Sequence, residues 1–214
     1  MYEKYVKRLI DFVLSAIGII VLLWLYLILA IAILIDDPGP IFFKQKRVGK
    51  GKTLFNLYKF RSMKMSTPHD IPTHMLKNPE QYITRVGRVM RKTSMDELPQ
   101  LGQILTGKMS IIGPRPALWN QDDLIAERDK YGANDVKPGL TGWAQINGRD
   151  ELEISAKAKL DGDYTVQLQA GGFKAFLFDC RCFIGTIFSV ARGDGVVEGG
   201  TGVIHKKELN NGKQ

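Results

Sequence analysis

Asp96 and Glu97 are neighbouring carboxylates placed where a helix is expected to begin. Pro99 follows closely, and proline is tolerated in the first turn of a helix but not inside it. Apolar residues then recur with helical spacing at Leu98, Leu101, Ile104 and Leu105. The positive end of the helix dipole would hold both carboxylates ionised, a state in which they can accept phosphoryl groups or bind cations. Helix capping is the alternative, with Ser94 and Glu97 as a capping box.

Arginines in rigid turns are the second group of candidates. Arg115 lies between two prolines, and a guanidinium held in place suits bidentate binding of a phosphate. Arg149 ends the glycine-rich segment 137–149, for which a hairpin with a surface arginine is the alternative. Further basic residues, including Arg88, line one face of a helix expected over residues 81–91. These cations favour an anionic ligand.

Residues 12–35 form an apolar segment without a charged side chain. A helix of this length measures about 36 Å, which exceeds the hydrocarbon core of a bilayer, about 30 Å. A cleaved signal peptide would have a shorter apolar region and a small-residue cleavage site. The segment 36–40, Asp-Asp-Pro-Gly-Pro, instead indicates the end of a helix and a turn. We therefore predict a membrane-anchoring helix over residues 1–37.

Basic residues flank the anchoring helix at both ends: Lys4, Lys7 and Arg8 before it, and Lys44, Lys46, Arg47, Lys50 and Lys52 after it. Because basic residues favour the cytoplasmic side, the helix is expected to enter and leave the membrane on the same face. Such a re-entrant helix normally has a break, and here only Ser15 and Gly18 stand in for a proline. A single crossing stays the alternative.

The rest of the chain consists of short elements and turns. Loose alternation over residues 52–60 predicts a short strand or extended arm. Over residues 173–191, apolar side chains recur at three- and four-residue spacing, which predicts an amphipathic helix against the core or the membrane surface. Residues 66–79 form a polar loop, and its His69 and His74 have no further ligands that would fix a metal site.

The overall charge also points to an anionic partner. The formal net charge is +8 and the pI is near 9.4, so phospholipid headgroups, phosphorylated substrates and nucleic acid are the candidates. The basic residues are interleaved with glycine and proline turns and carry no nucleic-acid-binding signature, so we expect no nucleic acid partner. Cys180 and Cys182 are too close for an ordinary disulfide and indicate free thiols in a reducing compartment.

Several segments together resemble the bacterial sugar transferase family, the monotopic phosphoglycosyl transferases, in its small single-domain form. In chain order they are Lys7-Arg8 with Asp11, and then residues 37–49, 58–63, 91–100, 107–116 and 139–149. The resemblance covers most of the chain. It implies an α+β, mostly helical fold, in which a re-entrant membrane helix carries a small membrane-surface catalytic domain of amphipathic helices and a short sheet. Unlike many members, this sequence has no proline in the anchoring helix.

The resemblance implies a covalent phosphoglycosyl transfer. Asp96 would attack the β-phosphorus of a UDP-sugar, expel UMP and pass the sugar phosphate to polyprenyl (undecaprenyl) phosphate. Asp96 would also bind Mg²⁺, and Glu97 would orient the metal or the acceptor phosphate. The residues that the resemblance assigns to substrate binding are Lys59, Arg88, Arg115, Arg149 and, as a second acidic position, Asp163.

The same resemblance places the chain at the bacterial inner (cytoplasmic) membrane, with its catalytic domain on the cytoplasmic face. The expected organisation is an anchor over residues 1–37, a transferase domain over 38–200 and a flexible tail over 201–214. The expected partners are the UDP-sugar, polyprenyl phosphate and membrane lipid, and other glycan-assembly enzymes could join them. The enzyme would catalyse the first membrane step of bacterial glycan assembly.

Two other functions are compatible with parts of the sequence. A membrane-tethered basic module for anionic lipid or nucleic acid would explain the anchor and the charge alone. A membrane glycosyltransferase that passes only the sugar would release UDP instead of UMP. The nucleotide product therefore separates these functions, while no motif in the sequence specifies the sugar.

Overall fold

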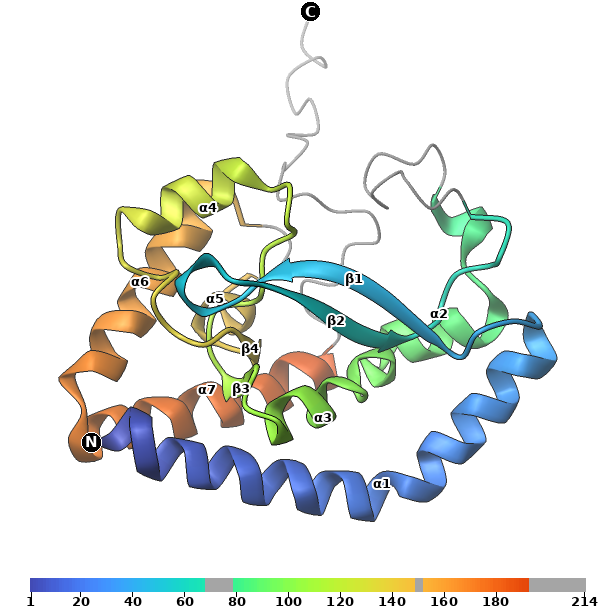
Figure 1. Cartoon of the computed structure of the whole chain (residues 1–214), viewed down its shortest axis with the longest axis horizontal. Helices are drawn as coiled ribbons and strands as arrows, with labels where there is room; N and C mark the ends of the chain where they lie inside the picture. Colours follow the sequence, from blue (N-terminus) through green and yellow to red (C-terminus); the bar gives the residue numbers. More distant parts are fainter. Residues whose placement is uncertain (68–78, 149–151, 193–214) are drawn as a thin grey trace, which may run out of the picture.

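The computed structural model describes residues 1–67, 79–148 and 152–192 (Figure 1). A π-helical turn, η1 (Tyr2–Lys7), continues into the long helix α1 (Arg8–Asp36). The other elements follow in chain order: β1 (Phe42–Val48), η2 (Lys50–Lys52), β2 (Leu54–Phe60), η4 (Pro79–Tyr82), α2 (Arg85–Lys92), η5 (Met95–Glu97), α3 (Gln100–Leu105), β3 (Ser110–Ile112), α4 (Asp122–Asp129), β4 (Gly139–Thr141), α5 (Trp143–Ile146), α6 (Ile154–Ala170) and α7 (Gly172–Arg192). Within these residues the chain is mostly helical with short strands, which confirms the predicted α+β class. His69, His74, Arg149 and the predicted tail 201–214 lie outside the described residues.

β1 and β2 pair as an antiparallel hairpin along their whole length, which confirms the strand expected over residues 52–60. Gln103 fastens α3 to this hairpin. Its Nε2 donates to Asn56 O (2.5 Å), and its Oε1 accepts from the Tyr58 backbone N–H (3.1 Å). The side chain thus satisfies backbone groups of β2 much as a further strand would. α3 is therefore held beside the middle of β2.

β3 and β4 pair in parallel. The hairpin alternative for residues 137–149 is therefore wrong, because β4 takes β3 as its partner and is followed by the helical turn α5. Backbone bonds continue the pairing from Gly113 N–H to Thr141 O (2.8 Å) and from Gly139 N–H to Pro114 O (2.8 Å). A Cβ atom on Gly139 would lie 2.1 Å from the Gly113 nitrogen, so this close approach of the two backbone segments requires glycine.

η1 and α1 together form one helix, Tyr2–Asp36, which is long and apolar enough to cross a membrane by its length and composition. Most of its apolar side chains are exposed. Among the few that face the protein, Leu29 and Ile33 pack in a cluster with Phe60 and Met90. An exposed apolar surface of this extent is typical of a segment that contacts lipid or another protein.

The N-terminal end of this helix is bound to the centre of the domain. Lys7 Nζ forms a buried ion pair with Asp179 of α7 (2.8 Å). Arg8 donates to two carbonyls at the C-terminal end of α3 (2.6 and 2.7 Å). Asp11 accepts from Ser110 Oγ at the start of β3 (2.8 Å) and from the next backbone N–H (2.9 Å). Each polar residue of the segment Lys7-Arg8 with Asp11 therefore fixes the helix to a different element.

The C-terminal end of the helix is bound to the same domain. Asp36 Oδ2 accepts from the Val86 N–H in the first turn of α2 (2.8 Å), where the helix dipole favours a carboxylate. Arg61 pairs with the Asp37 carboxylate, and its guanidinium also donates to the Asp37 and Pro40 carbonyls. Figure 1 shows α1 along the lower edge of the molecule, with the other elements above it. Both ends of the apolar helix are thus fastened to one domain.

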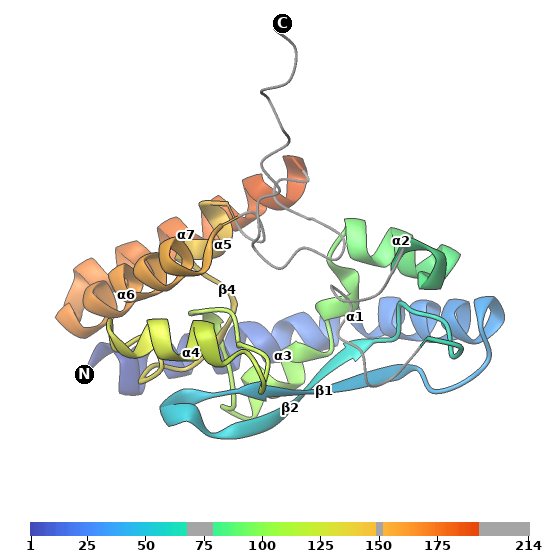
Figure 2. The ribbon, with the colours of Figure 1, turned by 90° about the horizontal axis from the view of Figure 1, so that it is seen from above.

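α7 confirms the amphipathic helix expected over residues 173–191. Its inward side carries Ala175 and Cys182, which are buried in the core. Its opposite side exposes large apolar side chains: Phe173, Leu177, Ile184, Ile187 and Phe188. Figure 2 shows α7 beside α6 on one flank of the molecule. The helix packs on the core and still presents an unpaired apolar face, so the two predicted uses of its apolar residues do not exclude each other.

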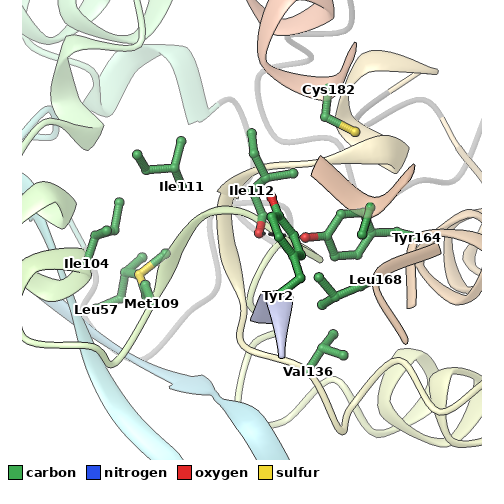
Figure 3. Packing of buried hydrophobic residues seen from close by; sticks show 11 residues of the cluster. Tyr2, Leu57, Ile104, Met109, Ile111, Ile112, Val136, Tyr164, Leu168 and Cys182 are labelled. Atoms are coloured by element: carbon green, nitrogen blue, oxygen red, sulfur yellow. Dashed lines mark hydrogen bonds between the residues drawn. The ribbon is translucent and has the colours of Figure 1, made fainter. Parts of the chain in front are cut away.

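The largest buried cluster joins the two ends of the described chain (Figure 3). The Tyr2 hydroxyl donates to Asp179 Oδ2 (2.7 Å). The Tyr164 hydroxyl lies 3.0 Å from Ile112 O and 3.0 Å from Asp179 Oδ1. Tyr164 and Leu168 come from α6, a helix that sequence patterning did not identify. These contacts close the core around β3.

Candidate active site

Asp96 and Glu97 lie in η5, a short 3-10 turn between α2 and α3. The regular helix begins only at Gln100, so the prediction that it begins at about Asp96 placed its start too early. Ser94 adopts the left-handed conformation (φ 56°), and its side chain makes no capping hydrogen bond. The capping-box alternative is therefore wrong. The Glu97 carboxylate instead pairs with the side chains of Lys59 and Arg115.

Glu97 is held by two cations from distant parts of the chain. Lys59 Nζ, on β2, lies 2.7 Å from Glu97 Oε1. Arg115 donates from Nη2 to Glu97 Oε1 (2.6 Å) and from Nη1 to Oε2 (3.3 Å), which is a bidentate pair. Burial alone would raise the pKa of the Glu97 carboxyl, but the charges and hydrogen bonds of Arg115 and Lys59 hold this pKa well below its usual range. Glu97 is therefore ionised and fixed in direction.

Asp96 is buried beside this cluster but is much less engaged. Its Oδ2 lies 3.9 Å from Lys59 Nζ, and no hydrogen bond to its carboxylate is found in the part of the chain that the structure describes. Burial raises the pKa of the Asp96 carboxyl, and the Glu97 charge adds to this rise while the Lys59 charge opposes it. Of the two neighbouring carboxylates, Asp96 is the one that accepts no side-chain hydrogen bond among the described residues.

Arg91 also belongs to this site, although sequence reasoning did not assign it there. Its Nε donates to Ser62 Oγ (3.0 Å), and its charge lowers the pKa of Asp96. Arg88, one turn earlier on α2, is exposed, and no hydrogen bond or ion pair of its side chain is found among the described residues. The basic face of α2 was visible in the sequence. Which of its arginines meets Asp96 depends on how the helix is rotated on its neighbours.

The second acidic position, Asp163, was expected near the site. Asp163 lies on the exposed side of α6, and within the described ranges no hydrogen bond or ion pair joins it to Asp96 or Glu97. The buried carboxylate of this helix is Asp161, which pairs with Arg128 of α4 (2.6 Å). Burial raises the pKa of Asp161, against the opposing charge of Arg128. The exposed side of α6 thus carries the expected residue, and the buried side carries its near neighbour.

The donor set fits a magnesium ion that is shared with a substrate. No group of three or more His, Cys, Asp or Glu side chains that could hold a metal occurs among the residues the structure describes. Mg²⁺, however, is commonly bound through one or two carboxylates, with substrate phosphates and water completing its shell. Asp96, whose ion pair with Lys59 is long at 3.9 Å, has the chemistry to provide one such carboxylate.

Replacement of Arg115 by lysine tests the bidentate contact. Arg115→Lys keeps the positive charge but loses the planar fork that binds both Glu97 oxygens. We expect catalytic efficiency to fall at least about tenfold, corresponding to roughly 1.4 kcal/mol. Steady-state kinetics of the purified variant measure the change, with Arg85→Lys on the exposed start of α2 as the matched control. Unchanged kinetics in a folded variant would mean that this turn is only structural.

The comparison with known proteins places the chain in a family. A family model described as bacterial sugar transferase matches residues 2–193. The chain therefore belongs to the bacterial sugar transferase family, as its motifs predicted.

Relatives with named activities share this region. The chain is 38% identical over 149 residues to the UDP-glucose:undecaprenyl-phosphate glucose-1-phosphate transferase of Xanthomonas campestris pv. campestris, covering 69% of this chain and 31% of that protein. It is 37% identical over 175 residues to the protein of the same name from Escherichia coli (strain K12), covering 76% and 36%. It is 39% identical over 167 residues to the UDP-N-acetylgalactosamine-undecaprenyl-phosphate N-acetylgalactosaminephosphotransferase of Aeromonas hydrophila, covering 75% and 38%. The chain spans about a third of the length of these relatives.

Proposed function

We propose that this chain transfers a sugar 1-phosphate from a UDP-sugar to undecaprenyl phosphate and releases UMP. The observation that carries the proposal is the different environment of the two carboxylates in the Asp96–Glu97 pair, called the dyad below. Glu97 is neutralised by close ion pairs with Lys59 and Arg115, whereas Asp96 makes one longer ion pair, with Lys59 at 3.9 Å, among the described residues. The names of the relatives, which are transferases of sugar phosphates to undecaprenyl phosphate, support the same reaction.

The proposed reaction has two displacements at one phosphorus atom. An Asp96 carboxylate oxygen attacks the β-phosphorus of the UDP-sugar, and the bond from this phosphorus to the bridging oxygen breaks. The electron pair leaves with UMP, and an aspartyl phosphosugar remains. A phosphate oxygen of undecaprenyl phosphate then attacks the same phosphorus. This second step frees Asp96 and forms the undecaprenyl diphosphate sugar.

The residues around Asp96 provide the charge that this reaction requires. A diphosphate resists attack by an anion, so cations near its oxygens lower the barrier. Lys59, Arg91 and Arg115 converge on the dyad and are suited to bind phosphate oxygens. Burial lowers the pKa of Lys59, and the Glu97 charge opposes this effect. Mg²⁺ held by Asp96 and substrate oxygens would supply further neutralisation of the diphosphate.

We also propose that the apolar helix enters and leaves the inner membrane on its cytoplasmic face. The support is that Lys7 and Arg8 at one end and Asp36 and Asp37 at the other bind the same domain. A straight crossing would put one end on the far side of the bilayer from the domain, across about 30 Å of hydrocarbon, and would break that end's contacts. Ser15 Oγ donates to the Phe12 carbonyl one turn back, a bond that favours bending of a helix.

Cysteine labelling tests this topology. With Cys180→Ser and Cys182→Ala as background, a cysteine replaces the exposed Lys4. In intact cells we expect no reaction with a membrane-impermeant maleimide, and full reaction after permeabilisation. Lys46→Cys, beyond the other end of the helix, is the matched control and should behave identically. Efficient labelling of Lys4→Cys from outside would establish a true crossing and exclude the re-entrant arrangement.

The nucleotide product tests the proposed activity. Purified protein with undecaprenyl phosphate, Mg²⁺ and a panel of UDP-sugars should release UMP with at least one sugar, and the panel would identify that sugar. Release of UDP would show that sugar alone is transferred. Absence of any nucleotide release, in protein that binds anionic vesicles, would favour the non-catalytic basic module.

A further inference from the structure

The turn that carries Arg115 is fixed through its carbonyl groups. The two flanking prolines have no N–H to donate, so the backbone oxygens are the main points of attachment. Pro114 O accepts from Gly139 N–H (2.8 Å), and Ala117 O accepts from Val48 N–H (2.9 Å). Between them, side chains act as donors to the remaining carbonyls. Arg47 Nη1 donates to the Pro116 carbonyl (2.9 Å).

The carbonyl of Arg115 itself is bound by Arg128. Arg128 Nη2, on α4, lies 2.9 Å from Arg115 O. The same guanidinium donates from Nε and Nη2 to Asp161 Oδ2 (2.8 and 2.6 Å). Arg128 is 4% exposed and Asp161 is 1% exposed. A buried pair of this kind adds little net stability compared with a well-packed apolar pair, so its presence beneath the turn calls for another role.

We propose that Arg128 and Asp161 are positioning residues that set the direction of the Arg115 side chain. Asp161 orients the guanidinium of Arg128, Arg128 holds the Arg115 carbonyl, and Arg115 binds Glu97 through both oxygens. The chain of contacts runs from α6 through α4 to the dyad without touching Asp96. This inference rests on the proposed function, because it assigns a role in the reaction at that site.

The two roles of Arg128, support of the fold and positioning of Arg115, predict different outcomes in a double-mutant cycle. Arg128→Gln removes the charge that orients the turn and should lower kcat/KM for UMP release about tenfold, with Asp161→Asn giving a similar fall. In an Arg115→Lys background, Arg128→Gln should lower kcat/KM less than twofold further, because the fork that it positions is already gone. A purely structural role would instead multiply the two losses. That multiplicative result would overturn the inference.

A matched control uses another buried ion pair that links distant elements. Lys7→Gln breaks the pair with Asp179 and does not touch the Arg115 turn. We expect Lys7→Gln to lower the thermal midpoint, and its effect on kcat/KM should be the same in the wild-type and Arg115→Lys backgrounds. Should Arg128→Gln not fold, Arg128→Lys takes its place in the same cycle. Wild-type protein that releases no UMP would refute the proposed function. UMP release together with losses in kcat/KM that multiply in the double mutant would refute only this inference.

Discussion

Replacement of Asp96 by asparagine should leave a folded protein that cannot release UMP. The carboxamide has nearly the same size as the carboxylate, and no hydrogen bond to Asp96 would be lost among the described residues. It is, however, a poor nucleophile and a weak ligand for Mg²⁺. We expect the rate of the first half-reaction to fall at least about a thousandfold, corresponding to roughly 4 kcal/mol. Single-turnover UMP release and the thermal unfolding midpoint, measured on the same preparation, check both parts.

The covalent adduct makes this prediction specific. Without undecaprenyl phosphate, wild-type protein and the correct UDP-sugar should yield UMP up to one equivalent, and intact mass should increase by one sugar phosphate. Asp96→Asn should show neither. Glu97→Gln should be impaired but still form some adduct, because Glu97 supports the site without attacking. Asp122→Asn, at the exposed first residue of α4, is the matched control. An adduct mapped to any residue other than Asp96 would contradict the mechanism.

Removal of Mg²⁺ should have an effect of similar size. The described residues offer Asp96 but no group of three metal-binding side chains, so the ion would depend on substrate oxygens for much of its shell. Excess EDTA should therefore lower UMP release by at least about a thousandfold, corresponding to roughly 4 kcal/mol. Readdition of Mg²⁺ should restore the rate fully, because the described residues contain no cluster that would hold a structural metal.

The dependence on substrate can be checked without turnover. Mn²⁺ binding, followed by its electron paramagnetic resonance signal, should be weak for the wild-type protein alone. It should tighten when a UDP-sugar is present. With the Asp96→Asn variant, the UDP-sugar should not tighten Mn²⁺ binding to the protein, and Mn²⁺ should bind only the UDP-sugar in solution. Equal and tight Mn²⁺ binding by the variant and the wild type would place the metal elsewhere.

Local patterns in the sequence predicted those features that neighbouring residues determine. These features are the apolar helix α1, the strand β2 and the amphipathic helix α7. In each of them the order of apolar and polar residues follows the side chains that are buried or exposed. The resemblance predicts that Asp96, Glu97, Lys59 and Arg115 belong to one site, and the structure brings their side chains together. None of these required knowledge of long-range packing.

Features that depend on distant contacts were not readable in the same way. The sequence offered Glu97 as a helix cap, but Lys59 and Arg115 bind it from positions 38 and 18 residues away. Asp161 and Asp163 differ by two positions, and only the packing of α6 decides which is buried. Arg91 and Arg88 are separated in the same manner by the rotation of α2. Such choices arise from tertiary contacts that no local pattern records.

The attachment of Lys7 to Asp179 has a consequence for the order of assembly. These partners are 172 residues apart, and at common synthesis rates the second follows the first by roughly ten to thirty seconds. The apolar helix therefore leaves the ribosome long before the carboxylate that will bind its first turn exists. An apolar helix of this kind is expected to enter lipid in that interval, so we expect insertion to precede the closing of the domain. Of the helices that the structure describes, the one made last is therefore the one that secures the one made first.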